Sequence, residues 1–187
     1  MTNENDQQLQ ATPSLYIVDL KDVNSAHLSQ VGGKNASLGE MIQNLTDAGI
    51  QVPGGFATTV HAYREFLAYN CLDERISEKL EALNINDVKA LDLASKQIRR
   101  WMMAGEIFPE LKKEISRAYA RLKNKTVAVR SSATAEDLPD ASFAGQQESF
   151  LNVKGVTHVM NAVRMVFASL FTSRAISYRY RHGYSFG

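Results

Sequence analysis

Cysteine is nearly absent from this sequence: Cys71 is the only one in 187 residues. A single thiol can form neither an internal disulfide nor a cysteine-rich zinc site, which favours a reducing, cytoplasmic compartment. Because Cys71 falls in a segment with helical spacing of apolar residues, we expect a buried, unreactive thiol. The four histidines have no metal-ligand spacing, so the sequence predicts no metal site of its own.

An excess of one charge and a long apolar run are also absent. Lysine and arginine total 21, aspartate and glutamate total 20, and the formal net charge is +1. The sequence therefore lacks the overall basic field that favours a nucleic-acid partner. It also lacks an apolar run long enough to span a bilayer, so no membrane partner is predicted. Residues 1–14 are polar and have no apolar signal region, which predicts a disordered tail.

Apolar periodicity predicts short strands separated by several helices. Apolar residues form short runs typical of strands at 15–20, 126–130 and 148–153. They recur at helical spacing in six further segments, which are 38–45, 60–67, 91–102, 111–122, 156–170 and 172–182. Thr59 and Asp87 are placed to cap two of these helices, and Pro109 to begin a third. This pattern is typical of an α+β or α/β fold.

The segment between the last two predicted strands is the most informative part of the chain. It is long and made of small and polar residues, and such connections tend to be binding loops or lids. In the strand before it, Val127 and Val129 should face the core, whereas Ala128 and Arg130 should point to the opposite side. The Arg130 guanidinium should therefore point away from the core at the position where the loop begins. That group suits a phosphate, and an internal salt bridge to Glu136 or Asp137 is an equally good interpretation.

A second candidate is Val31-Gly-Gly-Lys-Asn35, just before the first strong helix. Its glycines permit close backbone approach, a helix N-terminus favours negative charge, and Lys34 adds a cation. It is not a P-loop, because Leu28 and Asn35 stand where that motif requires Gly and Ser or Thr. On spacing alone, a turn with a solvated lysine is the simpler interpretation.

Charged side chains elsewhere have simpler interpretations. Arg174, Arg179 and Arg181 lie in the last predicted helix and are interpreted as its solvated face. Glu136 and Asp137 are adjacent carboxylates that could touch Mg²⁺, although solvated loop charges need no such role. We therefore assign no catalytic residue from spacing alone.

Three ordered motifs closely resemble the N-terminal ATP-binding region of the phosphoenolpyruvate synthase family. They span residues 32–41, 52–56 and 127–147, and the resemblance covers nearly everything from Leu15 to about Tyr184. In the related pyruvate phosphate dikinases, the corresponding loop is rich in Met and lacks the Ala-Glu-Asp-Leu-Pro segment. Rifampin phosphotransferases share much of that segment and remain an alternative.

The resemblance implies an α+β fold over residues 15–187. This would be the first, N-terminal lobe of an ATP-grasp nucleotide-binding domain, with a mixed sheet and several flanking helices. The resemblance also implies that a lysine and an arginine hold ATP phosphates while a glycine loop covers them. The residues implied, with Ser149 the weakest, are Lys34, Arg130, Gly145, Gln146, Gln147 and Ser149.

In a complete enzyme of this family, ATP, pyruvate and water give phosphoenolpyruvate, AMP and phosphate, with Mg²⁺ as cofactor. The phosphoryl group passes through a histidine on a swivelling domain. The sequence ends after a helix, so we expect a truncated fragment that lacks the second lobe with the Mg²⁺ ligands, the phosphohistidine domain and the pyruvate site. Such a fragment would be inactive alone. The alternatives are the same lobe of a rifampin phosphotransferase, or a non-catalytic nucleotide-binding module.

Overall fold

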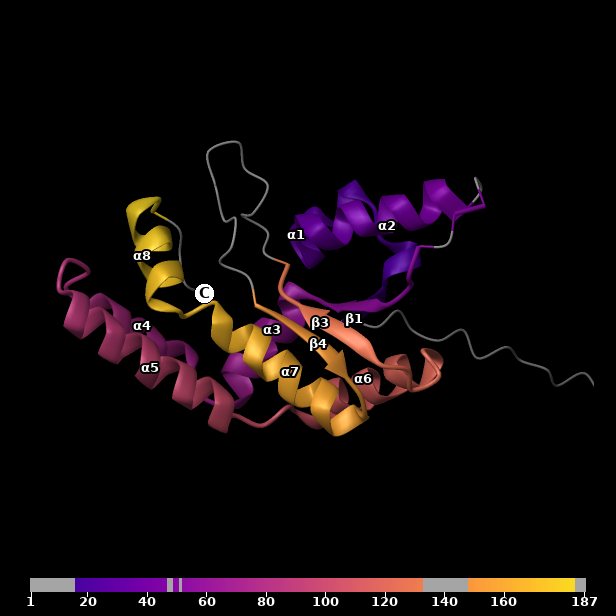
Figure 1. Ribbon diagram of the computed structural model, residues 1–187. Coiled ribbons are helices and arrows are strands. Elements are labelled where there is room, and N and C mark those ends of the chain that lie inside the picture. The colour runs from indigo at the N-terminus through magenta and orange to yellow at the C-terminus, as the bar shows by residue number, and fades with distance from the viewer. Residues whose placement is uncertain (1–15, 47–48, 51, 133–147, 184–187) are drawn as a thin grey trace, which may run out of the picture.

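The computed structural model describes residues 16–46, 49–50, 52–132 and 148–183 (Figure 1). The predicted tail, residues 1–14, lies outside this part. In chain order the described elements are β1 (Ile17–Asp19), η1 (Leu20–Asp22), η2 (Ser25–His27), α1 (Leu28–Val31), α2 (Gly33–Thr46), β2 (Phe56–Thr58), α3 (Val60–Tyr69), α4 (Asp73–Glu81), α5 (Val88–Ala104), α6 (Pro109–Arg121), β3 (Val127–Arg130), β4 (Ser149–Val153), α7 (Val156–Ser169) and α8 (Ser173–Arg181). The α+β class is confirmed. None of these helices combines the length and hydrophobicity of a transmembrane span.

The strands form two separate sheets rather than the mixed sheet that the resemblance implied. In the described part of the chain, β1 pairs only with β2 and β3 only with β4, both antiparallel. A mixed sheet also needs parallel neighbours, and both strand pairs found among the described residues are antiparallel. A two-stranded sheet is only marginally stable by itself, so these sheets need helices packed against them. Helix α7 packs against β3 and β4, and α6 packs against β1 (Figure 1).

Predicted capping residues define several helix boundaries. Thr59 Oγ1 accepts the Ala62 N–H at 3.1 Å at the start of α3. The Asp87 carboxylate accepts two backbone N–H groups, each at 3.0 Å, at the start of α5. Pro109 is the first residue of α6, where its missing N–H costs nothing. These local signals explain why the helix predictions were confirmed.

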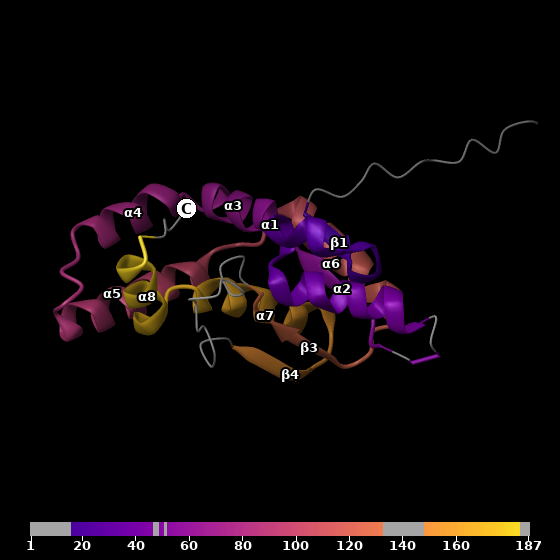
Figure 2. The same cartoon turned by 90° about the horizontal axis from the view of Figure 1, so that it is seen from above.

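The side chains form two hydrophobic clusters. The larger one joins α3 to α8 and includes Phe66, Ile98 and Leu111, all with exposures of 0%. The smaller one lies beneath α2 and consists of Leu20, Val23, Val31, Ala36 and Ala57. Figure 2 shows α2 at one end of the molecule, and α4, α5 and α8 at the other.

Strand β1 connects the two clusters. Tyr16, just before it, places its ring edge-on to Phe108, with centroids 4.9 Å apart. Arg121 of α6 also donates to Asp19 at 2.6 Å, although the exposure of this pair limits its contribution to about 0–1 kcal/mol. The connection is therefore mainly apolar.

Cys71 is exposed, so the predicted buried thiol is wrong. Helix α3 ends at Tyr69, and Cys71 occupies the turn before α4 with a φ of 51°. Its N–H bonds to the Ala68 carbonyl at 3.0 Å. The helical spacing of apolar residues continues from α3 into α4, and the turn between them contains no glycine or proline. Nothing in the sequence therefore indicates this turn.

Gly39 allows α2 to lie directly on the backbone of η1. A Cβ at residue 39 would be 2.1 Å from the Val23 carbonyl oxygen and 2.8 Å from that of Leu20. Gly39→Ala should therefore push α2 away from η1 and lower the free energy of unfolding by about 1–3 kcal/mol. This outcome reverses the usual preference for alanine within a helix. Urea denaturation measures it.

Ser37→Ala is the matched control for Gly39→Ala. Ser37 is exposed on the same helix, so its replacement should leave stability within about 0.5 kcal/mol. If Gly39→Ala unfolded at the same urea concentration as Ser37→Ala, the close packing of α2 on η1 would be unimportant for stability.

Candidate functional site

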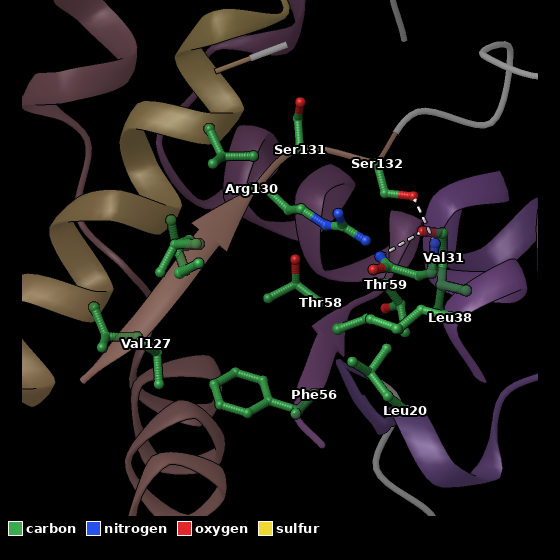
Figure 3. A pocket seen from close by; sticks show the side chains of 18 of the residues that line it. Leu20, Val31, Leu38, Phe56, Thr58, Thr59, Val127, Arg130, Ser131 and Ser132 are labelled. Atoms are coloured by element: carbon green, nitrogen blue, oxygen red, sulfur yellow. Dashed lines mark hydrogen bonds between the residues drawn. The ribbon is translucent and has the colours of Figure 1, made fainter. Parts of the chain in front are cut away.

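A cavity of about 780 Å³ lies between the two hydrophobic clusters (Figure 3). Strands β2 and β3 face each other across it, and residues of η1, α1, α2, α3, α6, α7 and α8 also line it. Its volume is in the range of small-molecule sites, which are commonly about 300–1,000 Å³. The cavity therefore has the size to hold a nucleotide-sized ligand.

The lining of this cavity combines apolar walls with positive charge. Leu20, Phe56 and Val127 are among the apolar side chains visible in Figure 3. The described lining residues include Arg64, Arg130 and Arg179, but no aspartate or glutamate. Cations near an apolar surface attract anions more strongly than cations in bulk water do. The cavity is consequently suited to an anion with an apolar body.

The structure brings the glycine turn before α2 into contact with the segment after β3. The Asn35 N–H donates to Ser132 Oγ at 3.3 Å, although the two residues are 97 positions apart (Figure 3). Ser132 therefore satisfies one of the N–H groups that every helix N-terminus leaves without an intrahelical acceptor. A Cβ on Gly32 would lie only 2.5 Å from the same Oγ atom. Only glycine permits this approach.

Arg130 lies at the end of β3, beside this contact. The predicted alternation is confirmed, because Val127 and Val129 are partly buried whereas Ala128 and Arg130 are exposed. The side chain of Arg130 extends over Thr58 toward the side of the cavity that carries Val31 (Figure 3). The alternative partners Glu136 and Asp137 lie outside the described residues.

The other predicted phosphate-binding residues have different positions. Lys34 is the second residue of α2 and is partly buried, but it is not among the residues that line the cavity. Ser149 pairs with Arg130 across the β3–β4 register and is exposed, also outside the lining. The predicted cover residues Gly145, Gln146 and Gln147 lie outside the described part of the chain.

Arg179 was missed as a site residue, and its interpretation as part of a solvated face is wrong. Arg174 and Arg181 are exposed, but Arg179 is partly buried and lines the cavity. This burial lowers the pKa of the Arg179 guanidinium. A signal was present in the spacing, because Arg179 follows the buried Ala175 by four positions and so shares its helix face.

Two buried hydroxyl groups belong to residues that line the cavity. Ser131 Oγ and the Tyr63 hydroxyl each lack a hydrogen-bond partner among the described residues. Burial raises the pKa of the Tyr63 hydroxyl, which keeps it in the protonated, donating form. Because buried polar groups are normally hydrogen-bonded, these two hydroxyls are available to hydrogen-bond a ligand in the cavity.

The described residues offer no cluster of three or more His, Cys, Asp or Glu side chains that could hold a metal ion. A Mg²⁺ ion normally requires several oxygen ligands. Protein carboxylates commonly supply one or two of these ligands, and waters and substrate phosphates supply the rest.

Comparison with known proteins places the site in a wider context. Residues 28–186 match the protein family described as pyruvate phosphate dikinase, AMP/ATP-binding domain. The Pseudomonas aeruginosa protein named phosphoenolpyruvate synthase is 56% identical over 173 residues, which cover 90% of this chain and 22% of that protein. The protein of the same name from Deinococcus radiodurans is 57% identical over 155 residues, which cover 82% of this chain and 20% of that protein.

The protein of that name from Escherichia coli is 55% identical over 161 residues, which cover 84% of this chain. That match covers 20% of the relative. The chain thus spans about a fifth of the length of these curated relatives.

Proposed function

The chain belongs to the pyruvate phosphate dikinase AMP/ATP-binding domain family, and on this basis we propose that the cavity between β2 and β3 binds ATP. In this proposal the chain is the ATP-binding part of a phosphoenolpyruvate synthase and forms the first lobe of an ATP-grasp domain. The observation that carries it is the combination of three arginines, no carboxylate and apolar walls among the described lining residues. A nucleotide offers both a polyanion and a flat apolar base.

The phosphates are proposed to lie at the contact between the glycine turn and Ser132. Arg130 offers a planar fork of donors that matches phosphate oxygens. The N-terminus of α2 adds the partial positive charge of its backbone N–H groups, and Gly32 lets Ser132 pack against this terminus. Lys34 supplies a further cation at the same helix terminus. Ser149 and the residues at positions 145–147 are proposed as part of the cover.

In the complete protein, we propose that ATP, pyruvate and water become phosphoenolpyruvate, AMP and phosphate through a phosphohistidine on another domain. Phosphoryl transfer depends mainly on positioning and on stabilising charge on the phosphate oxygens. Arg130 and Lys34 would contribute by holding the phosphates and neutralising their charge. The Mg²⁺ ligands are proposed to lie in another part of the complete protein. The names of the relatives favour pyruvate over a rifampin-type acceptor.

Replacement of Arg130 tests this function directly. Arg130→Ala should weaken ATP binding by about tenfold or more, since hydrogen bonds to charged groups contribute about 1.5–3 kcal/mol. Arg130→Lys should give an intermediate affinity because it keeps the charge but loses the planar fork. Isothermal titration of the chain with ATP measures both. Arg174→Ala is the control, since Arg174 is an exposed arginine outside the cavity lining.

The titration has two outcomes that count against the proposal. Absence of ATP binding by the unmodified chain would contradict the proposal that this cavity binds ATP. Equal ATP affinities for Arg130→Ala and Arg174→Ala would contradict the placement of the phosphates at Arg130.

A further inference from the structure

The cavity has an apolar end that lies away from Arg130. Val127 begins β3 and Phe56 begins β2, whereas Arg130 and Thr58 end these two strands. Figure 3 shows Val127 and Phe56 toward one end of the cavity, with Thr58 between Phe56 and Arg130. Because a strand rises about 3.3 Å per residue, the backbones of Val127 and Arg130 are roughly 10 Å apart. The cavity can therefore hold the base and the phosphates of one nucleotide at different ends.

Four side chains give this end an apolar lining from two sides. Leu20 and Leu38 belong to the smaller cluster or pack against it, and Phe56 and Val127 pack against the larger one. All four line the cavity (Figure 3). None has a polar side-chain atom, so an oxyanion among them would lose its hydration without gaining a hydrogen bond from them. A flat apolar group would instead gain free energy, because it removes these surfaces from water.

The Tyr119 hydroxyl, close to this end in the chain, already has both of its hydrogen bonds. Tyr119 lines the cavity, and its hydroxyl donates to the carbonyl of Lys125, two residues before Val127, at 2.9 Å. The same hydroxyl accepts the Gly155 N–H at 2.9 Å. Tyr119 is thus able to offer a ligand the surface of its ring, while its hydroxyl joins α6 to the two ends of the β3–β4 pair.

Phe56 supplies an aromatic ring at the apolar end. It closes the motif at residues 52–56, and Pro53, Gly54 and Gly55 of that motif line the cavity with it. Phe56 is only partly buried, so part of its side chain can contact a ligand. Aromatic rings stack on nucleic-acid bases, because every base has a π-face.

We propose that the base of the nucleotide lies at this apolar end, stacked on Phe56 between Leu20 and Val127. The phosphates then extend along β3 toward Arg130. This inference rests on the proposed nucleotide function and adds the residues that hold the base and the direction in which the nucleotide lies. It also gives the motif at residues 52–56 a role in binding.

Comparison of ATP with inorganic tripolyphosphate tests the role of Phe56, because tripolyphosphate has the phosphates without the base. Phe56→Ala should weaken ATP binding by about tenfold, as expected for the loss of a base–aromatic stack, and leave tripolyphosphate affinity unchanged. Phe56→Tyr keeps the ring and should retain most of the ATP affinity. Calorimetric titration measures both ligands. Tyr180→Leu is the control, since Tyr180 is 58% exposed and outside the cavity lining.

Photolabelling of the unmodified chain tests the same placement without any substitution. On irradiation, 2-azido-ATP forms a covalent bond from its base to nearby residues. Mass spectrometry should find the label within residues 53–56 or 119–127, and excess ATP should prevent it. Labelling confined to residues 31–35 or to Ser132 would place the base at the opposite end and overturn the proposal.

Two results from the titrations would also overturn it. Unchanged ATP affinity in Phe56→Ala, while Arg130→Ala still weakens ATP, would remove the base from Phe56 and leave the proposed function intact. An equal loss of ATP and tripolyphosphate affinity in Phe56→Ala would mean that the ring supports the cavity without contacting the base. If Phe56→Ala does not fold, the photolabelling decides.

Discussion

Gly32→Ala should destabilise the chain by about 2–6 kcal/mol and remove measurable ATP binding. Gly32 has φ 79° and ψ 161°, a conformation essentially restricted to glycine that costs other residues about 1–3 kcal/mol. The added methyl would also lie 2.5 Å from Ser132 Oγ and 2.6 Å from its carbonyl oxygen. Such overpacking costs about a further 1–3 kcal/mol. Urea unfolding and ATP calorimetry measure the two effects.

Two controls show whether the contact with Ser132 causes the loss. Gly54→Ala adds the same methyl in open space, without a left-handed φ, and should be neutral or stabilising by about 0.4–1 kcal/mol. Adding Ser132→Gly to Gly32→Ala should restore little stability, because the Ser132 backbone remains in the way. Wild-type stability in Gly32→Ala would refute the close approach of these two segments.

Phe66→Ala should lower the free energy of unfolding by about 3–5 kcal/mol, the usual cost of deleting a buried aromatic ring. Phe66 is 0% exposed, and its ring centroid lies 5.4 Å from that of Phe167. Phe167 also lines the cavity, so the void left by residue 66 would weaken the support of that wall. Chemical denaturation measures the loss of stability, and calorimetry measures the accompanying loss of ATP affinity.

Leu93→Ala is the control for this truncation. Leu93 is 66% exposed on α5, so its replacement should change stability by less than about 0.5 kcal/mol. Phe66→Leu should fall between the two variants, because it keeps an apolar side chain in most of the space. Equal costs for Phe66→Ala and Leu93→Ala would mean that the larger cluster does not depend on this ring.

The helices and strands were largely predictable because their signals are local. Thr59, Asp87 and Pro109 begin helices through contacts within one turn, and β3 and β4 lie within the predicted runs. The prediction for Cys71 was wrong, because this residue lies in a turn with a positive φ after a helix. No glycine or proline in the sequence indicates that turn. Strand pairing was less predictable, since partners distant in the sequence decide whether a sheet is mixed.

By itself the sequence determined the α+β class, the alternation that directs Arg130 away from the core, and the resemblance that identifies the family. Only the tertiary structure brought Ser132 to the N-terminus of α2 and placed Arg179 and Tyr63 in the same cavity as Arg130. The physical reason is that periodicity and capping depend on residues a few positions apart. A cavity depends on how distant elements pack, and no local pattern records which side chains will meet there.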